Sequence, residues 1–258
     1  MEAQKLAANR GWDWIKQGYA LFMKAPLLWL VLLLICFFAV TVLSIIPIIG
    51  QPLASLLLPV ILVGLMDGCR ALTQGEELEL AHLFSGFSKR TAQLITLGGI
   101  ALVAQFLIFG VMMMVGGATL VSILMSGQPP EDPEIIQQAL AGAGLAVILG
   151  ITLFSALIMG MQFAPMLAFF NNVAPLAAMK LSLRAFINNI GAMLVYGVTL
   201  ILLAILASIP LMLGWLVLLP VIVTSIYAAY CDIFPSPTQA DGAVLEGEVI
   251  SRDDQAHF

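Results

Sequence analysis

Six apolar segments of the chain are each long enough to cross a bilayer, and this feature constrains the fold most. They cover residues 27–46, 53–72, 94–125, 139–170, 190–209 and 215–234. An α-helix rises 1.5 Å per residue, so about 20 residues span the ~30 Å hydrocarbon core. Only 10% of the 258 residues are charged, whereas soluble domains are about one-quarter charged. The sequence therefore predicts an all-α, polytopic membrane protein with six transmembrane helices, forming a membrane domain over residues 27–234.

Much of the first pair of apolar segments is repeated near the C-terminus. Residues 44–70 and 207–232 each contain a proline between two apolar runs, a glycine soon after it, and then Leu-Pro-Val-Ile. Pro59 and Pro220 fall inside the returning runs, where a proline removes one backbone hydrogen bond and kinks the helix. Such a kink is either a packing feature or the wall of a hinge or ligand cavity. We expect three pseudo-repeated hairpins, each preceded by a cytoplasmic amphipathic helix.

The three amphipathic helices are predicted from apolar residues that recur at steps of three and four. The first lies in the leader, residues 1–26, and its expected face is Ala8, Trp12, Ile15, Tyr19 and Phe22. The second lies within 73–91, with a stripe of Leu80, Leu83, Phe84 and Phe87, and the third lies within 171–189. A helix of this kind either lies on the membrane surface or packs on the protein's own bundle.

Two further segments depart from the simple pattern. Residues 94–125 would extend about 48 Å as one helix, so this run must tilt, break near Gly116–Gly117 or project beyond the membrane. The connection that follows, residues 126–138, is rich in proline and acidic residues. Residues 235–258 hold several acids and few large apolar residues, which predicts a disordered acidic tail.

The positive charges define an orientation. All ten Lys and Arg residues lie before the first apolar segment, in or beside the connections after the second and fourth, or in the tail. The other three connections contain none. Because cytoplasmic connections carry an excess of Lys and Arg, we expect both termini and the three amphipathic helices to be cytoplasmic.

Few polar side chains lie inside the predicted spans. No ionisable residue occupies a deep position, which argues against a proton-coupled transporter with a midplane carboxylate. Asp67 and Arg70 share a helical face at the cytoplasmic end of the second span, as a local ion pair or as a gate or ligand contact. Gln105 and Gln162 lie at similar predicted depths, so they either form an interhelical amide pair or contact a substrate.

Motifs for catalysis or cofactor binding are missing from the sequence. The three cysteines have no metal-ligand spacing, and no phosphate loop, HExxH motif or nucleophile elbow occurs. We expect no catalytic residue, no metal, no cofactor and no nucleic-acid partner. The enzymatic alternative, a membrane-embedded lipid-modifying activity, requires Asp67, Arg70, Glu79 and His82 to converge in space.

Four stretches, taken in order, carry a family resemblance. They are G-W-D-W-I-K-Q-G-Y-A-L-F (11–22), A-P-L-L-W-L (25–30), L-L-P-V-I-L-V-G-L-M-D-G-C-R-A-L (57–72) and E-L-A-H-L-F-S-G-F (79–87). Together they resemble a family of uncharacterised bacterial multi-pass inner-membrane proteins, over about residues 8–234. The repeated unit is more loosely similar to the membrane domain of some glycerophosphodiester phosphodiesterases, which implies the fold only. The resemblance implies a location in the bacterial inner membrane and brings no catalytic residues.

Two functions fit these observations. The first is a non-enzymatic accessory or scaffold protein that organises membrane lipids or holds a protein partner at its cytoplasmic face, alone or as a homo-oligomer. The alternative is a small permease or channel for a neutral or lipid-like solute, lined by the Pro59 and Pro220 kinks with Gln105 and Gln162. A permease requires a polar cavity that reaches the membrane midplane, whereas a scaffold can be packed solid.

Overall fold

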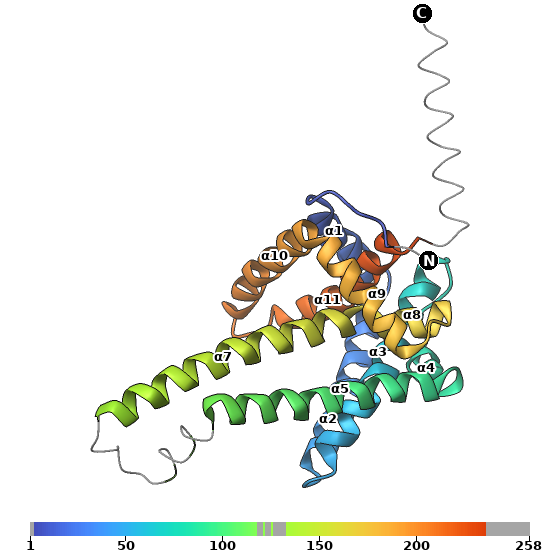
Figure 1. Ribbon diagram of the computed structural model, residues 1–258. Coiled ribbons are helices and arrows are strands. Elements are labelled where there is room, and N and C mark those ends of the chain that lie inside the picture. Colours follow the sequence, from blue (N-terminus) through green and yellow to red (C-terminus); the bar gives the residue numbers. More distant parts are fainter. Residues whose placement is uncertain (1–2, 118–120, 122–124, 126–132, 236–258) are drawn as a thin grey trace, which may run out of the picture. The chain divides into compact units, whose positions relative to one another are not determined.

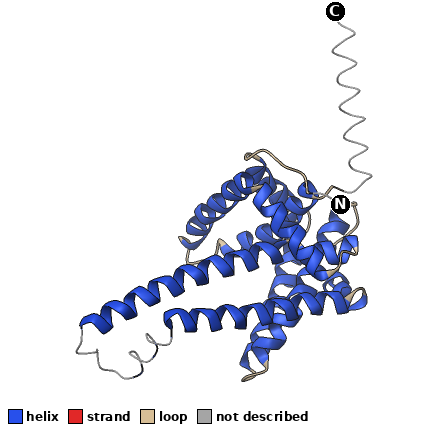
Figure 2. Ribbon diagram, in the orientation of Figure 1, coloured by secondary structure: helices blue, strands red, loops and turns tan. Residues whose placement is uncertain are grey.

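The computed structural model describes residues 3–117, 121, 125 and 133–235 of the chain (Figure 1). Within these residues all regular secondary structure is helical (Figure 2). Six helices in this part of the chain are long and apolar enough to cross a membrane: Pro26–Ile45, Gly50–Thr73, Thr91–Gly116, Ala141–Asn171, Ile190–Ser208 and Trp215–Ile233. The prediction of an all-helical chain with six candidate spans is confirmed at this level.

The helices follow one another with short connections. Their bounds are α1 (Arg10–Phe22), α2 (Pro26–Ile45), α3 (Gly50–Thr73), η1 (Leu80–Phe84), α4 (Ser85–Ser88), α5 (Thr91–Met112), η2 (Met113–Gly117), α7 (Pro133–Gln162), α8 (Ala164–Asn171), α9 (Pro175–Asn188), α10 (Ile190–Ser208) and α11 (Trp215–Ile233). The chain divides into two compact units. The α1 unit comprises Met1–Leu34, Leu65–Leu80 and Arg184–Phe258, and the α5 unit comprises Ile35–Gly64 and Ala81–Leu183.

In the α1 unit, α1 packs against both α10 and α11. The Trp14 side chain is completely buried, and its ring meets that of Tyr196 edge to face at 6.0 Å. A β-carbon on Gly18 would lie 2.6 Å from the backbone nitrogen of Ser225, so the glycine allows the two backbones to touch. The Thr224 hydroxyl donates a 2.8 Å hydrogen bond to the Gly18 carbonyl. Helix α1 is therefore fixed to α11 by backbone contact as well as by side chains.

The face that α1 packs against the protein overlaps only in part with the predicted apolar face. Ile15 and Phe22 are buried as expected, but Trp12 and Tyr19 remain 47% and 49% exposed. The buried face is instead made by Gly11, Trp14, Ile15, Gly18, Leu21 and Phe22. The two glycines bring α1 close enough to its neighbours for the large Trp14 ring to fill the interface.

In the α5 unit, the helices are joined by close crossings and by buried hydroxyls. A β-carbon on Gly98 would lie 2.7 Å from the Leu56 Cα, so the backbones of α3 and α5 touch there. The fully buried Ser182 of α9 donates to the Met159 carbonyl at 2.7 Å and accepts from the Phe163 N–H at 3.0 Å. These contacts fix α9 to the end of α7.

Two of the longer predicted elements are interrupted. The second amphipathic segment is not one helix but a 3₁₀ turn, η1, followed by the single turn α4. Only Leu83 of its predicted stripe is buried. The third apolar run breaks at Gly116, whose φ of 163° and ψ of −8° are not helical. Of the three expected alternatives, tilting, breaking or projecting, the structure shows the break. Residues 126–132 of the acidic connection and 236–258 of the predicted tail lie outside the described residues.

Candidate functional site

Asp232, in the last turn of α11, holds the N-terminal end of α1. Its carboxylate accepts hydrogen bonds from Arg10 Nε at 2.8 Å, from Arg10 Nη2 at 2.6 Å and from Trp14 Nε1 at 2.8 Å. The hydrogen bond to Asp232 raises the pKa of Arg10 despite partial desolvation. The guanidinium therefore keeps its positive charge as the pH rises. We call these three residues the α1 clamp.

Asn189 supports the segment before α1. Its side-chain oxygen accepts a hydrogen bond from the Leu6 N–H at 2.7 Å, and its nitrogen donates to the Gln4 carbonyl at 2.8 Å. Asn189 is 1% exposed, so these bonds are shielded from water and contribute more than surface bonds would. Sequence spacing does not predict these bonds, because partners more than 180 residues away leave no local pattern.

An apolar groove with a volume of about 510 Å³ lies between α1, α10 and α11. Trp12, Lys16 and Tyr19 line it from α1, Leu206 from α10, and Val217 from α11. The Lys16 side chain is 57% exposed and its ammonium pairs with Asp13 at 2.7 Å, and this hydrogen bond lowers the pKa of Asp13. We call this feature the α1 groove. It combines an almost wholly apolar wall with two aromatic rings and one exposed cation.

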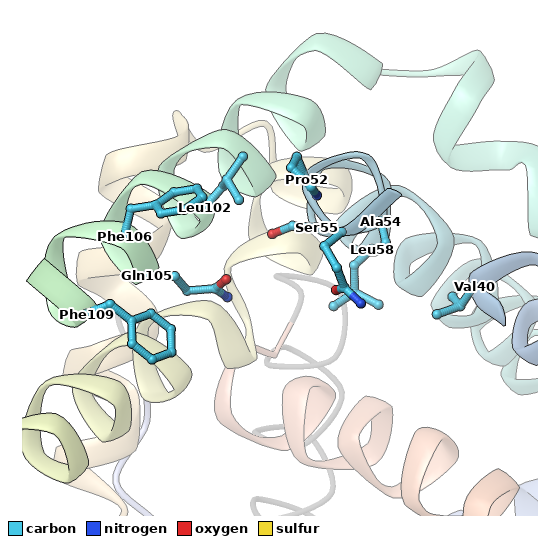
Figure 3. Close-up of a pocket in the computed structure, with 10 residues that line it drawn as sticks. Val40, Pro52, Ala54, Ser55, Leu58, Leu102, Gln105, Phe106 and Phe109 are labelled. Carbon is cyan, nitrogen blue, oxygen red and sulfur yellow. The ribbon is translucent and has the colours of Figure 1, made fainter. Parts of the chain in front are cut away.

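A second cavity, with a volume of about 410 Å³, lies within the α5 unit between α2, α3 and α5. Three polar side chains line it, Gln51 and Ser55 from α3 and Gln105 from α5. Figure 3 shows the Gln105 carboxamide and the Ser55 hydroxyl directed into the space between these helices, with Phe109 beside them. None of the ten lining residues is ionisable. We call this feature the amide cavity.

The amide cavity exists because α3 and α5 touch on one side of it. At Gly98 the backbones are in contact, with a hypothetical β-carbon 2.7 Å from the Ser55 carbonyl oxygen. Gln105 is two helical turns further along α5 and lines the cavity. All ten lining residues fall within three of the candidate spans. The cavity is thus a feature of the membrane-embedded part of the chain.

Comparison with known proteins identifies a relative over most of the chain. The chain is 31% identical over 202 residues to a probable inner membrane protein of Burkholderia thailandensis, and the match covers 76% of this chain and 74% of the relative. The chain belongs to the family of that inner membrane protein. Together with the six apolar helices, this makes it a multi-pass membrane protein.

Comparisons with family models and with solved structures do not describe this family further. No family model matches this inner membrane protein, and no solved structure matches it. The looser similarity to the membrane domain of some glycerophosphodiester phosphodiesterases therefore has no support among them.

The predicted amide pair does not form in this inner membrane protein. Gln105 lines the amide cavity, whereas Gln162 is the last residue of α7 and does not line it. No hydrogen bond joins the two side chains in the described part of the chain. The helix breaks directly after Gln162, at Phe163, while Gln105 faces α3.

The remaining candidate functional residues lie inside the spans or near their ends. Asp67 is half-buried and Arg70 exposed in the last turns of α3, and no ion pair joins them within the described residues. Pro59 and Pro220 are buried inside α3 and α11. Neither lines the amide cavity or the α1 groove, but Leu58 and Val221 beside them do.

The residues of the enzymatic alternative are divided between the units. Asp67, Arg70 and Glu79 belong to the α1 unit and His82 to the α5 unit. Among the described residues, no group of three or more His, Cys, Asp or Glu side chains could hold a metal ion. The enzymatic alternative stays a prediction.

Proposed function

We propose that this inner membrane protein is a non-enzymatic lipid-organising protein, which holds a membrane phospholipid in the α1 groove. The observation that carries the proposal is the groove itself, an apolar channel of about 510 Å³ bordered by Trp12, Tyr19 and Lys16. In a bilayer, acyl chains fill such a groove. Aromatic rings and lysine side chains lie at the level of the lipid headgroups, where the exposed Lys16 ammonium can pair with a lipid phosphate.

The α1 clamp supports this function because it forms one wall of the groove in advance. Arg10 and Trp14 bind Asp232, and Gly18 touches Ser225, so α1 is fixed along α10 and α11 before any ligand arrives. A preformed wall lowers the entropic cost of binding, since no helix has to be ordered by the ligand.

Retention of lipid by two matched variants tests the proposal. Leu206 and Leu202 are 61% and 62% exposed on α10, but only Leu206 lines the groove. We expect Leu206→Trp to lower the amount of co-purified phospholipid about fivefold or more, because overpacking costs about 1–3 kcal/mol. Leu202→Trp should retain as much lipid as the unmodified protein. Native mass spectrometry of protein extracted from its own membrane measures both.

The other results of that measurement have clear meanings. Equal lipid retention in the two variants would exclude the α1 groove as the site. A second polypeptide at fixed stoichiometry, without lipid, would favour a scaffold that holds a protein partner at its cytoplasmic face.

The same proposal places both termini in the cytoplasm. Its support is the distribution of the ten Lys and Arg residues, all on one side of a six-span chain. Alkaline phosphatase fused after Ile49 or Met212 should be active, since these connections would be periplasmic. Fusions after Gly75 or Asn172 should be inactive there and should fluoresce when green fluorescent protein replaces the phosphatase. The reverse pattern would overturn the orientation.

We also propose that the three hairpins are repeats of one unit. Its support is a contact that recurs three times. The segment before each hairpin contacts the second span of another hairpin, and that second span contains a proline. The contacts are Gly18 of α1 with Ser225 of α11, Gly86 of α4 with Val60 of α3, and Ser182 of α9 with Met159 of α7. The prolines of these returning spans are Pro220, Pro59 and Pro165.

The amide cavity favours a second candidate function, a small permease for a neutral or lipid-like solute. Its polar lining is uncharged and lies within the candidate spans. Passage along this route requires α3 and α5 to separate at Gly98, where their backbones touch. Uptake of a neutral solute by proteoliposomes at the rate of empty liposomes would leave the cavity as a binding site only.

A further inference from the structure

The amide cavity gathers polar side chains that have no hydrogen-bond partner in the described part of the chain. Many hydroxyl side chains in the described spans donate to the backbone carbonyl four residues earlier, at 2.7–2.8 Å. This holds for Thr41, Ser44, Thr96, Thr152, Thr199 and Ser208. Ser55 makes no such bond, and within the described chain neither Gln51 nor Gln105 has a side-chain hydrogen-bond partner. Three unpaired polar side chains therefore line one cavity.

An unpaired polar group at membrane depth requires an occupant that can bond it, and this applies to Gln105, well inside α5; Gln51 is the second residue of α3 and is exposed. Water is scarce in the hydrocarbon core, and a polar group without a partner there destabilises the fold. A carboxamide presents both a donor and an acceptor, and a hydroxyl does the same. An occupant that satisfies Gln51, Ser55 and Gln105 must therefore carry donors and acceptors of its own.

The lining also sets the charge and shape of the occupant. Because no lining residue is ionisable, a charged ligand would be buried without a counter-ion, which is strongly unfavourable. Leu102, Phe106 and Phe109 of α5 form an apolar wall beside the polar groups. A volume of about 410 Å³ is within the range of small-molecule sites.

We infer that the amide cavity binds one uncharged amphiphile, whose hydroxyl-bearing head bonds Gln105, Ser55 and Gln51 while its chain lies along Phe106 and Phe109. A glycerol ester with free hydroxyls has this chemistry. The site is separate from the α1 groove, which lies in the other unit and carries a cation suited to a phosphate.

Binding of 1-decanoylglycerol to the full-length protein in nanodiscs tests the inference. We expect saturable binding of one molecule per chain above the background of empty nanodiscs. Gln105→Leu should weaken binding about fivefold to tenfold, the effect of one lost hydrogen bond. Gln162→Leu removes an amide from a neighbouring span outside the cavity and should leave binding unchanged. Decanoate, which is charged, should not compete.

Several outcomes would overturn the inference. Binding no greater than in empty nanodiscs would mean that the cavity holds water alone. Equal affinity in Gln105→Leu, or competition by decanoate, would exclude the proposed head contacts. If Gln105→Leu does not fold, Ser55→Ala replaces it, with an expected loss of about fivefold. The groove variant Leu206→Trp should bind 1-decanoylglycerol normally, so failure of this inference and failure of the lipid-organising proposal are distinguishable.

Discussion

Replacing Gly18 by alanine is expected to separate α1 from α11 and to lower the stability of the protein in detergent by about 3 kcal/mol. The new β-carbon would lie 2.6 Å from the Ser225 backbone nitrogen and 2.8 Å from its Cα. Backbone atoms cannot move aside as a flexible side chain can, so the whole helix must shift. That shift would also break the hydrogen bond from the Thr224 hydroxyl to the Gly18 carbonyl.

A thermal unfolding experiment with tryptophan fluorescence measures this effect, because Trp14 is completely buried in the same interface. We expect a lower midpoint and a red-shifted emission before unfolding. Gly197→Ala is the matched control, since a β-carbon there has no neighbouring atom within 4 Å. It should keep or slightly raise the midpoint, because alanine favours a helix over glycine. Equal midpoints for the two variants would contradict the described contact between α1 and α11.

The helical class and the six candidate spans were predictable because they depend on local properties. A run of about 20 apolar residues has few alternatives to a helix in a bilayer. The first run was predicted at 27–46 and lies at Pro26–Ile45, and the last was predicted at 215–234 and lies at Trp215–Ile233. Proline and glycine mark both ends of these runs in the sequence.

The buried face of α1 was predicted only in part, because large apolar residues were used to choose it. Trp12 and Tyr19 have the correct spacing but remain half-exposed beside the α1 groove. Gly11 and Gly18 carry no hydropathy signal, yet they decide which face approaches α10 and α11 most closely. In membrane proteins, close backbone approach at small residues drives helix packing, so hydrophobic periodicity alone is a weaker guide than in soluble helices.

The Gln105–Gln162 pair shows a second reason why the sequence predicted the candidate site only in part. Counting residues from the end of a span gives the depth of a side chain but not the direction in which it points. Gln105 faces α3 and the amide cavity, while Gln162 ends α7 at the Phe163 break. The α1 clamp was missed for a related reason, since Arg10 and Asp232 are 222 residues apart and no local spacing connects them.

Asp232→Ala is expected to loosen α1 and, through it, to weaken lipid retention in the α1 groove. The change leaves the Arg10 guanidinium and the Trp14 N–H without their shared acceptor. Hydrogen bonds to charged groups contribute about 1.5–3 kcal/mol, so we expect a loss of about 2 kcal/mol, since Asp232 is 17% and Arg10 36% exposed. The pKa of Arg10 is raised, so the stability that its charged form contributes would be lost only as the pH rises through the pKa of the folded protein, above the ordinary value of an arginine. The effect should therefore not vary across the physiological pH range.

A double-mutant cycle with Arg10→Met separates the pair from its surroundings. If the clamp acts as a unit, the double variant Arg10→Met/Asp232→Ala should be little less stable than Asp232→Ala alone. Asp13→Asn is the control: Asp13 pairs with Lys16 at 2.7 Å and only at 3.9 Å with Arg10, both near the surface, so this change should leave the midpoint nearly unchanged. The same variants connect the fold to the function: Asp232→Ala should release phospholipid while Asp13→Asn keeps it, and binding of 1-decanoylglycerol should survive in both. Retention of phospholipid by a destabilised Asp232→Ala protein would show that the groove does not depend on α1, and the lipid-organising role would then have to rest on α10 and α11 alone.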